Sequence, residues 1–129
     1  MSGSYLLDTN IIISLLSGET STLTYLEESD EIFIPSIALG ELHYGAHKSV
    51  RVQQNLERIE GLIADTAVLD CDSDTARWYG IVKDRLRAKG RPLPENDIWI
   101  ASTALQHNLT LATRDAHFHH VEGLKLAQW

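Results

Sequence analysis

Four acidic residues stand at separate points along the chain where a folded protein could bring their carboxylates together: Asp8, Glu41, Asp97 and Asp115. Carboxylates at short range repel one another in a poorly solvated cleft, and this repulsion keeps some of them protonated. Hard divalent cations such as Mg²⁺ and Mn²⁺ prefer oxygen ligands and remove that cost. A cation held in this way can activate water and clamp phosphoryl oxygens. The pattern therefore indicates a metal-dependent site acting on a phosphate ester.

Each acid also has an ordinary structural explanation when it is considered alone. An aspartate that follows a strand commonly forms a turn or caps a helix. Asp97 would be stabilised at the positive end of a helix dipole, and a glutamate within a helix is usually solvated. Glu41 differs because its neighbours Ile37, Leu39 and Leu42 are apolar. The functional interpretation therefore depends on whether the fold carries all four acids to one place.

Alternating strand and helix signals predict the elements that position the acids. Short strands are expected over residues 4–7, 31–34, 66–69, 109–112 and 124–127. Helices are expected over residues 10–16, 21–28, 36–46, 50–63, 73–89, 94–107 and 115–119. Asn10 and Ser36 are the predicted N-caps of two of these helices, Gly90 is the predicted end of another, and Asn108 is a predicted left-handed cap. The alternation predicts one α/β domain over residues 1–129, with a mainly parallel central sheet and helices on both faces.

This topology would place the acids at one edge of the sheet. Ligands of open parallel sheets bind outside the carboxyl ends of the strands. Asp8 directly follows the first predicted strand, and Asp115 comes just past the fourth. Asp97 lies in the first turn of its helix, and Glu41 lies one turn inside another. We therefore expect all four within about a helical turn of the same edge.

Composition narrows the class of protein. The chain has 129 residues, of which 43% are hydrophobic and 22% charged, as in a globular domain. Its one cysteine, Cys71, excludes a disulfide-built scaffold and favours a reducing compartment. Residues 1–7 lack the pattern of a signal peptide, and the longest aliphatic run, residues 11–16, is too short to cross a bilayer. We therefore expect a cytoplasmic protein with no membrane partner.

The charges have two interpretations. Eleven basic residues against 18 acidic ones give a net charge of −7, which disfavours a polyanionic partner unless bound metals offset the acids. Six of the eleven basic residues, however, lie within residues 77–91. This segment predicts either a solvated helix face or a surface that binds RNA phosphates. Lys83, Arg87 and Arg91 would form a stripe if the helix reached Arg91. The possible RNA-binding residues are Arg85, Arg87 and Arg91.

Four segments in order resemble the PIN-domain ribonucleases, and within them the VapC-type toxins of bacterial toxin–antitoxin pairs. They are Leu6-Leu7-Asp8-Thr9-Asn10, Pro35-Ser36-Ile37-Ala38-Leu39-Gly40-Glu41-Leu42, Asn96-Asp97-Ile98-Trp99-Ile100-Ala101 and Thr113-Arg114-Asp115-Ala116-His117-Phe118, and Val121-Glu122-Gly123-Leu124 adds to the likeness. The resemblance covers essentially the whole chain and implies a PIN-like fold. It also implies an Mg²⁺- or Mn²⁺-dependent endoribonuclease with Asp8, Glu41, Asp97 and Asp115 as its catalytic and metal-binding acids.

The resemblance implies further properties. Thr9, Asn10 and Thr113 match polar positions that would orient the carboxylates or a water. Asp8 and Asp97 would bind the principal metal ion, while Glu41 and Asp115 complete the site or hold a second ion. The expected partners are an RNA substrate, a cognate antitoxin that blocks the cleft, and a second copy in a homodimer.

Two other functions stay open at this point. A phosphatase of the haloacid-dehalogenase type also begins with an aspartate after a strand, but it usually needs a second aspartate where this chain has Asn10. A non-catalytic module that binds RNA or protein on the same scaffold would not need all four acids. Release of phosphate from small phosphomonoesters and an RNA cleavage assay separate these alternatives.

Overall fold

Parallel strands joined by helices build the protein, whose computed structural model describes residues 3–129. Within these residues one sheet has five strands in the order β3-β2-β1-β4-β5, and every neighbouring pair is parallel. The strands are β1 (Ser4–Leu7), β2 (Glu31–Pro35), β3 (Ala67–Leu69), β4 (Thr110–Thr113) and β5 (Leu126–Gln128). The helices are α1 (Thr9–Leu16), α2 (Thr20–Glu28), α3 (Ser36–His47), α4 (Val52–Asp65), α5 (Ser73–Lys89), α6 (Glu95–Gln106) and the short 3₁₀ helix η1 (Ala116–His120).

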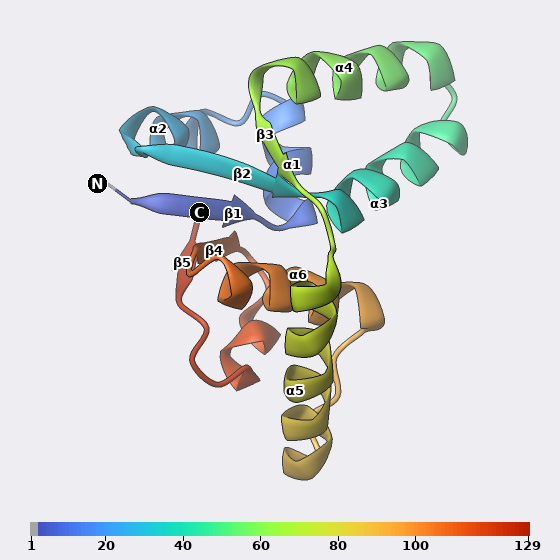
Figure 1. Cartoon of the computed structure of the whole chain (residues 1–129). Helices are drawn as coiled ribbons and strands as arrows, with labels where there is room; N and C mark the ends of the chain where they lie inside the picture. Colours follow the sequence, from blue (N-terminus) through green and yellow to red (C-terminus); the bar gives the residue numbers. More distant parts are fainter. Residues whose placement is uncertain (1–2) are drawn as a thin grey trace.

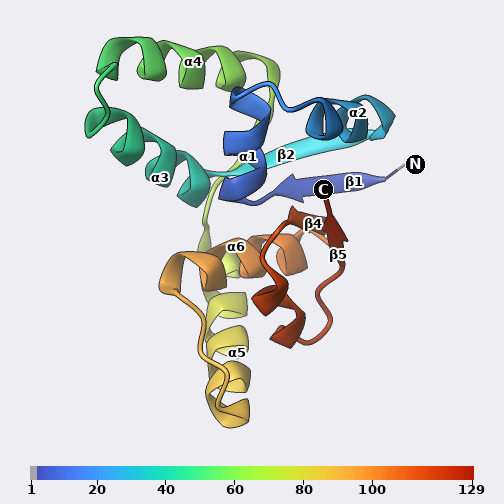
Figure 2. The same cartoon turned by 180° about the vertical axis from the view of Figure 1, so that it is seen from behind.

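The helices cover both sides of the sheet (Figures 1 and 2). From β1 the chain moves outward to β2 and then β3, and it carries α1 to α4 on one side. It then crosses through α5 and α6, on the other side, to reach β4 beside β1. Parallel strands joined by right-handed crossovers require this reversal when the chain returns past its first strand. The prediction of a parallel α/β domain with helices on both faces is confirmed.

The two central strands hold the middle of the core. Leu6 and Leu7 of β1 and Leu111 and Ala112 of β4 are fully buried. Unbroken apolar runs are typical of parallel strands that are covered on both faces, because neither side of the strand meets water. Burial of these runs fixes the carboxyl ends of β1 and β4, which Asp8 and Asp115 follow in the chain. Across residues 3–129, no helix combines the length and the apolar composition that spanning a bilayer would need.

Helix ends follow local signals, with two corrections. Every predicted element is present with its ends shifted by at most two residues. Gly90 (φ 67°) and Asn108 (φ 53°) adopt the left-handed conformation that was expected of them. The prediction of Asn10 as an N-cap is wrong, because the Asp8 side chain accepts from the Thr9 N–H and α1 already begins at Thr9. The prediction of Ser36 as an N-cap is also wrong, because the N-cap position of α3 is Pro35 and Ser36 is the first helical residue.

Candidate active site

The reversal of chain direction lies between β1 and β4, and it leaves a crevice at their carboxyl ends. Connections leave these neighbouring strands toward opposite sides of the sheet, and such a switch point is where open α/β sheets bind ligands. Asp8 is the residue after β1, and Asp115 follows the end of β4 by two residues. Two of the four predicted acids therefore stand at the place where the topology itself creates a binding site.

Asp8 is held rigidly in this crevice. Its side chain is only 4% exposed. Its Oδ1 accepts from the Thr9 N–H at 2.9 Å, and its Oδ2 accepts from the Thr113 hydroxyl at 2.7 Å. Burial raises the pKa of Asp8 and the nearby Asp115 charge adds to this, while the two hydrogen bonds act in the opposite direction. The carboxylate thus has a defined orientation but an unfavourable environment for its charge.

Glu41 reaches the same region from a different element. It lies in the second turn of α3, the helix that follows β2 directly. The Thr9 hydroxyl donates to Glu41 Oε1 at 3.0 Å. Thr9 therefore connects two acids, because its backbone N–H binds Asp8 and its side chain binds Glu41.

Asp97 connects the cluster electrostatically. It lies in the first turn of α6. Its pKa is raised from 3.8 to about 6, first by burial and then by the charges of Asp8, Asp115 and Glu41, while His117 lowers it. Like charges shift a pKa in this way only when they are close. Asp8, Asp115 and Glu41 therefore lie within electrostatic range of Asp97.

Asp115 is oriented by its own loop. Its N–H donates to Thr113 Oγ1 at 3.0 Å, and the same hydroxyl donates to Asp8. Its Oδ1 accepts from the His117 N–H at 2.9 Å and lies 2.8 Å from His117 Nδ1. A chain of hydrogen bonds thus links Asp8 to Asp115 through Thr113. Thr9 and Thr113, which were predicted as orienting residues, both contact carboxylates.

Asn10 contacts the loop that carries Asp115, and its predicted role of orienting a carboxylate or a water stays a prediction. Its Oδ1 accepts from the backbone N–H of Arg114 at 3.3 Å, and none of its hydrogen bonds reaches a carboxylate. Arg114 is not among the residues that the sequence predicts for the site. The one local signal that could have drawn attention to it is its position between Thr113 and Asp115, since successive side chains at a strand end point to opposite sides.

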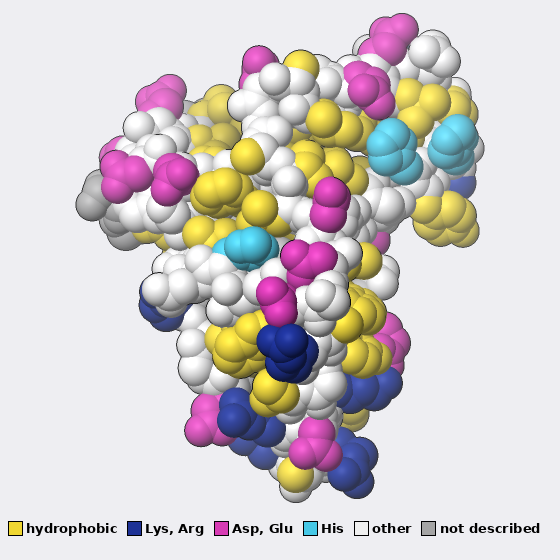
Figure 3. All heavy atoms as spheres, in the orientation of Figure 1, with side chains coloured by type: hydrophobic (Ala, Val, Ile, Leu, Met, Phe, Trp, Pro, Cys, Tyr) yellow, Lys and Arg dark blue, Asp and Glu magenta, His cyan; other side chains and the backbone are white. Residues whose placement is uncertain are grey.

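The predicted basic stripe is interrupted. Helix α5 ends at Lys89 and Gly90 turns left-handed, so Arg91 does not continue the face of Arg87. Arg87 pairs with Asp84 at 3.0 Å, and Lys83 pairs with Glu95 at 2.5 Å. Figure 3 shows the Lys and Arg side chains gathered over the lower part of the molecule, where α5 lies, with acidic side chains among them. Much of the positive charge of this segment is therefore locally balanced.

A groove with apolar walls opens beside the acids. It has a volume of about 610 Å³ and lies between α1, α3 and α4. Its walls include Ile13 and Tyr44, whose exposed fractions of 54% and 67% are high for such large hydrophobic side chains. Its polar lining residues include Thr9, Glu41 and Asn96 beside the basic residues Lys48 and Arg58. The groove therefore joins an apolar surface to Glu41, one of the four clustered acids.

The donor set suits a hard cation, although the acids do not form a closed cage. In the described part of the chain, no three His, Cys, Asp or Glu side chains are close enough together to enclose a metal ion. Mg²⁺ usually keeps several water ligands and is bound through only one or two carboxylates. All four clustered groups are oxygen donors, and two of them, Asp8 and Asp97, have raised pKa values.

Comparisons with known proteins assign the chain to a family. A family model described as the PIN domain matches residues 5–124. The chain is 32% identical to Ribonuclease VapC2 of Rickettsia felis, with 97% of each protein covered. It is 33% identical to the tRNA(fMet)-specific endonuclease VapC of Shigella flexneri, again over 97% of each. The crystal structure of VapBC2 from Rickettsia felis bound to a DNA fragment from their promoter matches with a TM-score of 0.91, at 31% identity and 98% coverage of both chains.

The chain belongs to the PIN-domain family and, within it, to the VapC-type ribonucleases. The resemblance given by the sequence segments is thereby confirmed, and so is the predicted PIN-like fold.

The raised pKa of Asp97 predicts a dependence of stability on pH. The folded metal-free protein binds the Asp97 proton more tightly than the unfolded chain does, so ionisation opposes folding. This penalty is absent below about pH 4, grows as the pH rises toward about 6, and is complete above that value. Asp97→Asn should therefore raise the melting temperature in EDTA at pH 7.5, with a smaller gain at pH 4.

Asp65→Asn is the matched control, because Asp65 is exposed at the end of α4 and precedes the amino end of β3 rather than following the carboxyl end of a strand. Thermal melts of the three proteins at both pH values provide the measurement. A difference between Asp97→Asn and wild type that is the same at pH 4 and pH 7.5 would contradict the predicted linkage.

Proposed function

We propose that this protein is the endoribonuclease toxin of a toxin–antitoxin pair and that it hydrolyses RNA phosphodiester bonds with the help of Mg²⁺ or Mn²⁺. The observation that carries the proposal is the convergence of four carboxylates at the β1–β4 switch point, where the charges of three of them raise the pKa of the fourth. Such repulsion disfavours the charged carboxylates unless a cation offsets it. Family membership supplies the class of reaction.

Asp8 and Asp97 would bind the principal ion, and Glu41 and Asp115 would complete the site or hold a second ion. When bound, a divalent cation activates water as a nucleophile and offsets the negative charge that develops on the phosphoryl oxygens. Mg²⁺ is usually bound through only one or two carboxylates, so Asp8 and Asp97 would suffice as direct ligands. With a pKa of about 6, Asp97 is mostly ionised at neutral pH and available as a ligand.

The other polar residues of the site orient its carboxylates. Thr113 and the Thr9 N–H each occupy one oxygen of Asp8, so the remaining lone pairs of that carboxylate have a fixed direction. Thr9 does the same for one oxygen of Glu41. Orientation in advance matters because electrostatic stabilisation costs little when the groups need not reorganise during the reaction.

The substrate is RNA, and initiator tRNA is the first RNA to test, because the Shigella flexneri relative is named a tRNA(fMet)-specific endonuclease. A net charge of −7 repels RNA at long range, so binding depends on cations at the site and on local basic residues. Arg85, Arg87 and Arg91 stay candidates for phosphate contacts, with Arg87 partly neutralised by Asp84. No feature of the site favours a phosphatase or a non-catalytic module.

Cleavage should depend on both the cation and the acids. RNA cleavage should stop in EDTA and return with added Mg²⁺ or Mn²⁺. Asp8→Asn and Asp97→Asn should each lower the rate at least about 100-fold, because each removes a ligand charge while it keeps the side-chain shape. Gel analysis of initiator tRNA and total RNA, beside Asp65→Asn as the control, provides the measurement. Cleavage that persists in EDTA, or full activity in both variants, would exclude the proposed mechanism.

A cognate antitoxin is the proposed protein partner, and the groove between α1, α3 and α4 is its proposed docking site. The Rickettsia felis neighbour was solved as a VapBC2 assembly. The exposed Ile13 and Tyr44 fit an apolar segment, and Glu41, which also lines the groove, fits a basic side chain. A segment bound in this way would cover the entrance to the acids. Self-association as a homodimer and a cytoplasmic location stay predictions.

Ile13→Glu tests the docking site. A buried carboxylate in an apolar contact is costly, so this variant should lose co-purification with the protein encoded beside it. Leu126→Glu on β5 is the control, because Leu126 is also an exposed hydrophobic residue but lies outside the groove. Expression of the wild-type toxin alone should arrest growth, and the adjacent protein should relieve that arrest. If the adjacent protein relieves growth arrest and co-purifies equally well with Ile13→Glu and with Leu126→Glu, the partner binds outside this groove.

A further inference from the structure

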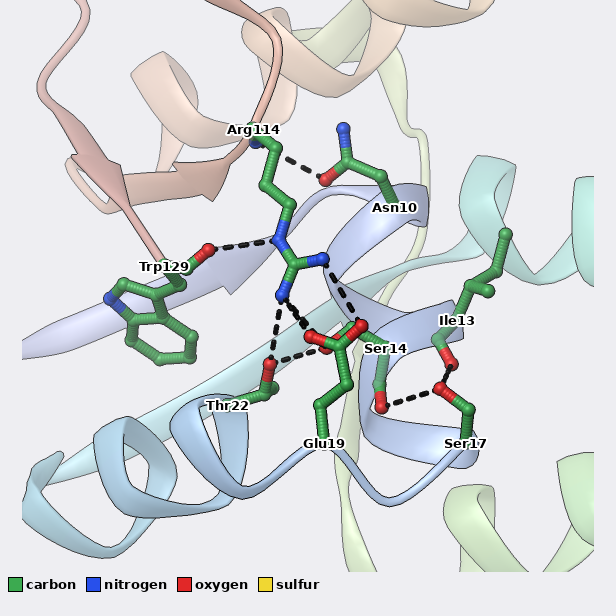
Figure 4. A network of polar contacts seen from close by, with 8 residues as sticks. All are labelled: Asn10, Ile13, Ser14, Ser17, Glu19, Thr22, Arg114 and Trp129. Carbon is green, nitrogen blue, oxygen red and sulfur yellow. Dashed lines mark hydrogen bonds and ion pairs between the residues drawn. The ribbon is translucent and has the colours of Figure 1, made fainter.

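The Arg114 guanidinium lies among Ser14, Glu19, Thr22 and Trp129, and its hydrogen bonds go to these residues rather than to the four clustered acids (Figure 4). Its Nη2 lies 2.5 Å from Glu19 Oε2 and donates to Ser14 Oγ at 3.0 Å. A longer contact of 3.3 Å joins Nη2 to Thr22 Oγ1. Its Nε donates to the carbonyl oxygen of Trp129 at 2.9 Å. One side chain thus connects α1, the start of α2 and the end of β5.

The partners of Arg114 are themselves held in place. Thr22 is fully buried, Ser14 is 3% exposed, and the two hydroxyls are hydrogen-bonded to each other. Trp129 is 7% exposed, stacks on Tyr25 at 5.4 Å between ring centroids, and packs against Tyr5. A guanidinium that binds rigid groups in several directions is itself rigid, since its planar fork fixes the direction of each bond.

Arg114 also lies between two residues of the site. The Thr113 hydroxyl donates to Asp8 and accepts from the Asp115 N–H, while the Arg114 side chain reaches Glu19 and Trp129 (Figure 4). The Arg114 backbone N–H donates to Asn10, in the first turn of α1. Fixing Arg114 therefore restricts the backbone that carries Asp115 and ties it to the helix that carries Thr9.

We propose that Arg114 is a positioning residue, which sets the place of Asp115 relative to Asp8 by clamping the β4–η1 loop to α1, α2 and the end of β5. This inference rests on the proposed function and deepens it. Displacement of a reacting group by about 1 Å can cost about 100-fold in rate, so a clamp outside the crevice can act on catalysis without touching substrate. The ion pair with Glu19 keeps the Arg114 charge engaged away from the cluster.

Arg114→Lys is the test variant, because lysine keeps the charge but cannot bind Glu19, Ser14 and Trp129 together. Glu19→Gln weakens the same clamp from its far side. Arg77→Lys is the matched control, since Arg77 forms an exposed ion pair with Asp74 on α5. The readouts are kcat and KM for RNA cleavage, the dissociation constant for Mn²⁺ by calorimetry, and amide hydrogen exchange over residues 113–117.

Arg114→Lys should lower kcat about 10- to 100-fold with little change in KM, weaken Mn²⁺ binding several-fold, and speed exchange over residues 113–117. Glu19→Gln should act in the same direction, and the double variant should add little to Arg114→Lys because both changes break one clamp. All proteins are compared well below their melting temperatures. A role limited to stability would lower the melting temperature and leave kcat and Mn²⁺ affinity equal to those of Arg77→Lys, and that result would overturn the proposal.

Failure of the proposed function has a different signature. In that case the wild-type protein would neither cleave RNA nor bind Mn²⁺. Amide exchange over residues 113–117 would still report on the clamp. An exchange rate in Arg114→Lys equal to that of the wild type would overturn the inference by itself. A wild type that cleaves RNA and binds Mn²⁺, beside an Arg114→Lys variant that does both equally well, would reject only the positioning role.

Discussion

The hydrogen bond from Thr113 to the buried carboxylate of Asp8 joins the carboxyl ends of β1 and β4, and the site depends on it. These strands are neighbours in space but are separated by most of the chain, because α1 to α6 and two other strands intervene. The same hydroxyl oxygen accepts a hydrogen bond from the Asp115 N–H. One threonine therefore links the first and the last of the four clustered acids, Asp8 and Asp115, at the only point of the described sheet where the crossovers reverse.

Burial and mutual repulsion make this cluster unfavourable in the metal-free protein. Desolvation raises the pKa of both Asp8 and Asp97, and for Asp97 three neighbouring carboxylates add to the effect. The surroundings offset only part of this cost, through the hydrogen bonds of Thr9 and Thr113. The same groups that destabilise the empty site are the ones that attract a divalent cation, so stability and function oppose each other here. The buried apolar residues of β1 and β4 stabilise the fold against this cost.

The sequence predicted most of the fold because its signals are local. The apolar run before Asp8, Pro35 at the end of a short strand, and Gly90 after a long helix each determine the conformation within a few residues. Strand and helix alternation then restricts the topology to parallel arrangements with the acids at one edge. This reasoning predicts Asp8, Glu41, Asp97 and Asp115 at one edge of the sheet from the sequence alone.

Other features could not be predicted because they depend on distant partners. Asn10 was expected to cap α1, but Asp8 takes that position and Asn10 binds the Arg114 backbone instead, about one hundred residues along the chain. The contacts of Arg114 with Glu19 and Trp129 have no spacing rule that would reveal them. The pairing of Lys83 with Glu95 likewise follows from how α5 packs on α6 rather than from periodicity.

The central claim is that the four carboxylates are gathered to hold a divalent cation, and Mn²⁺-dependent stabilisation tests it most directly. A ligand that binds only the folded state at 100 times its dissociation constant adds about 2.7 kcal/mol to the free energy of unfolding. The melting temperature of the wild-type protein at pH 7.5 should therefore rise by several degrees as Mn²⁺ is added after EDTA treatment, while Asp97→Asn should gain little. An unchanged wild-type melting temperature, or an equal rise in Asp97→Asn, would contradict the account.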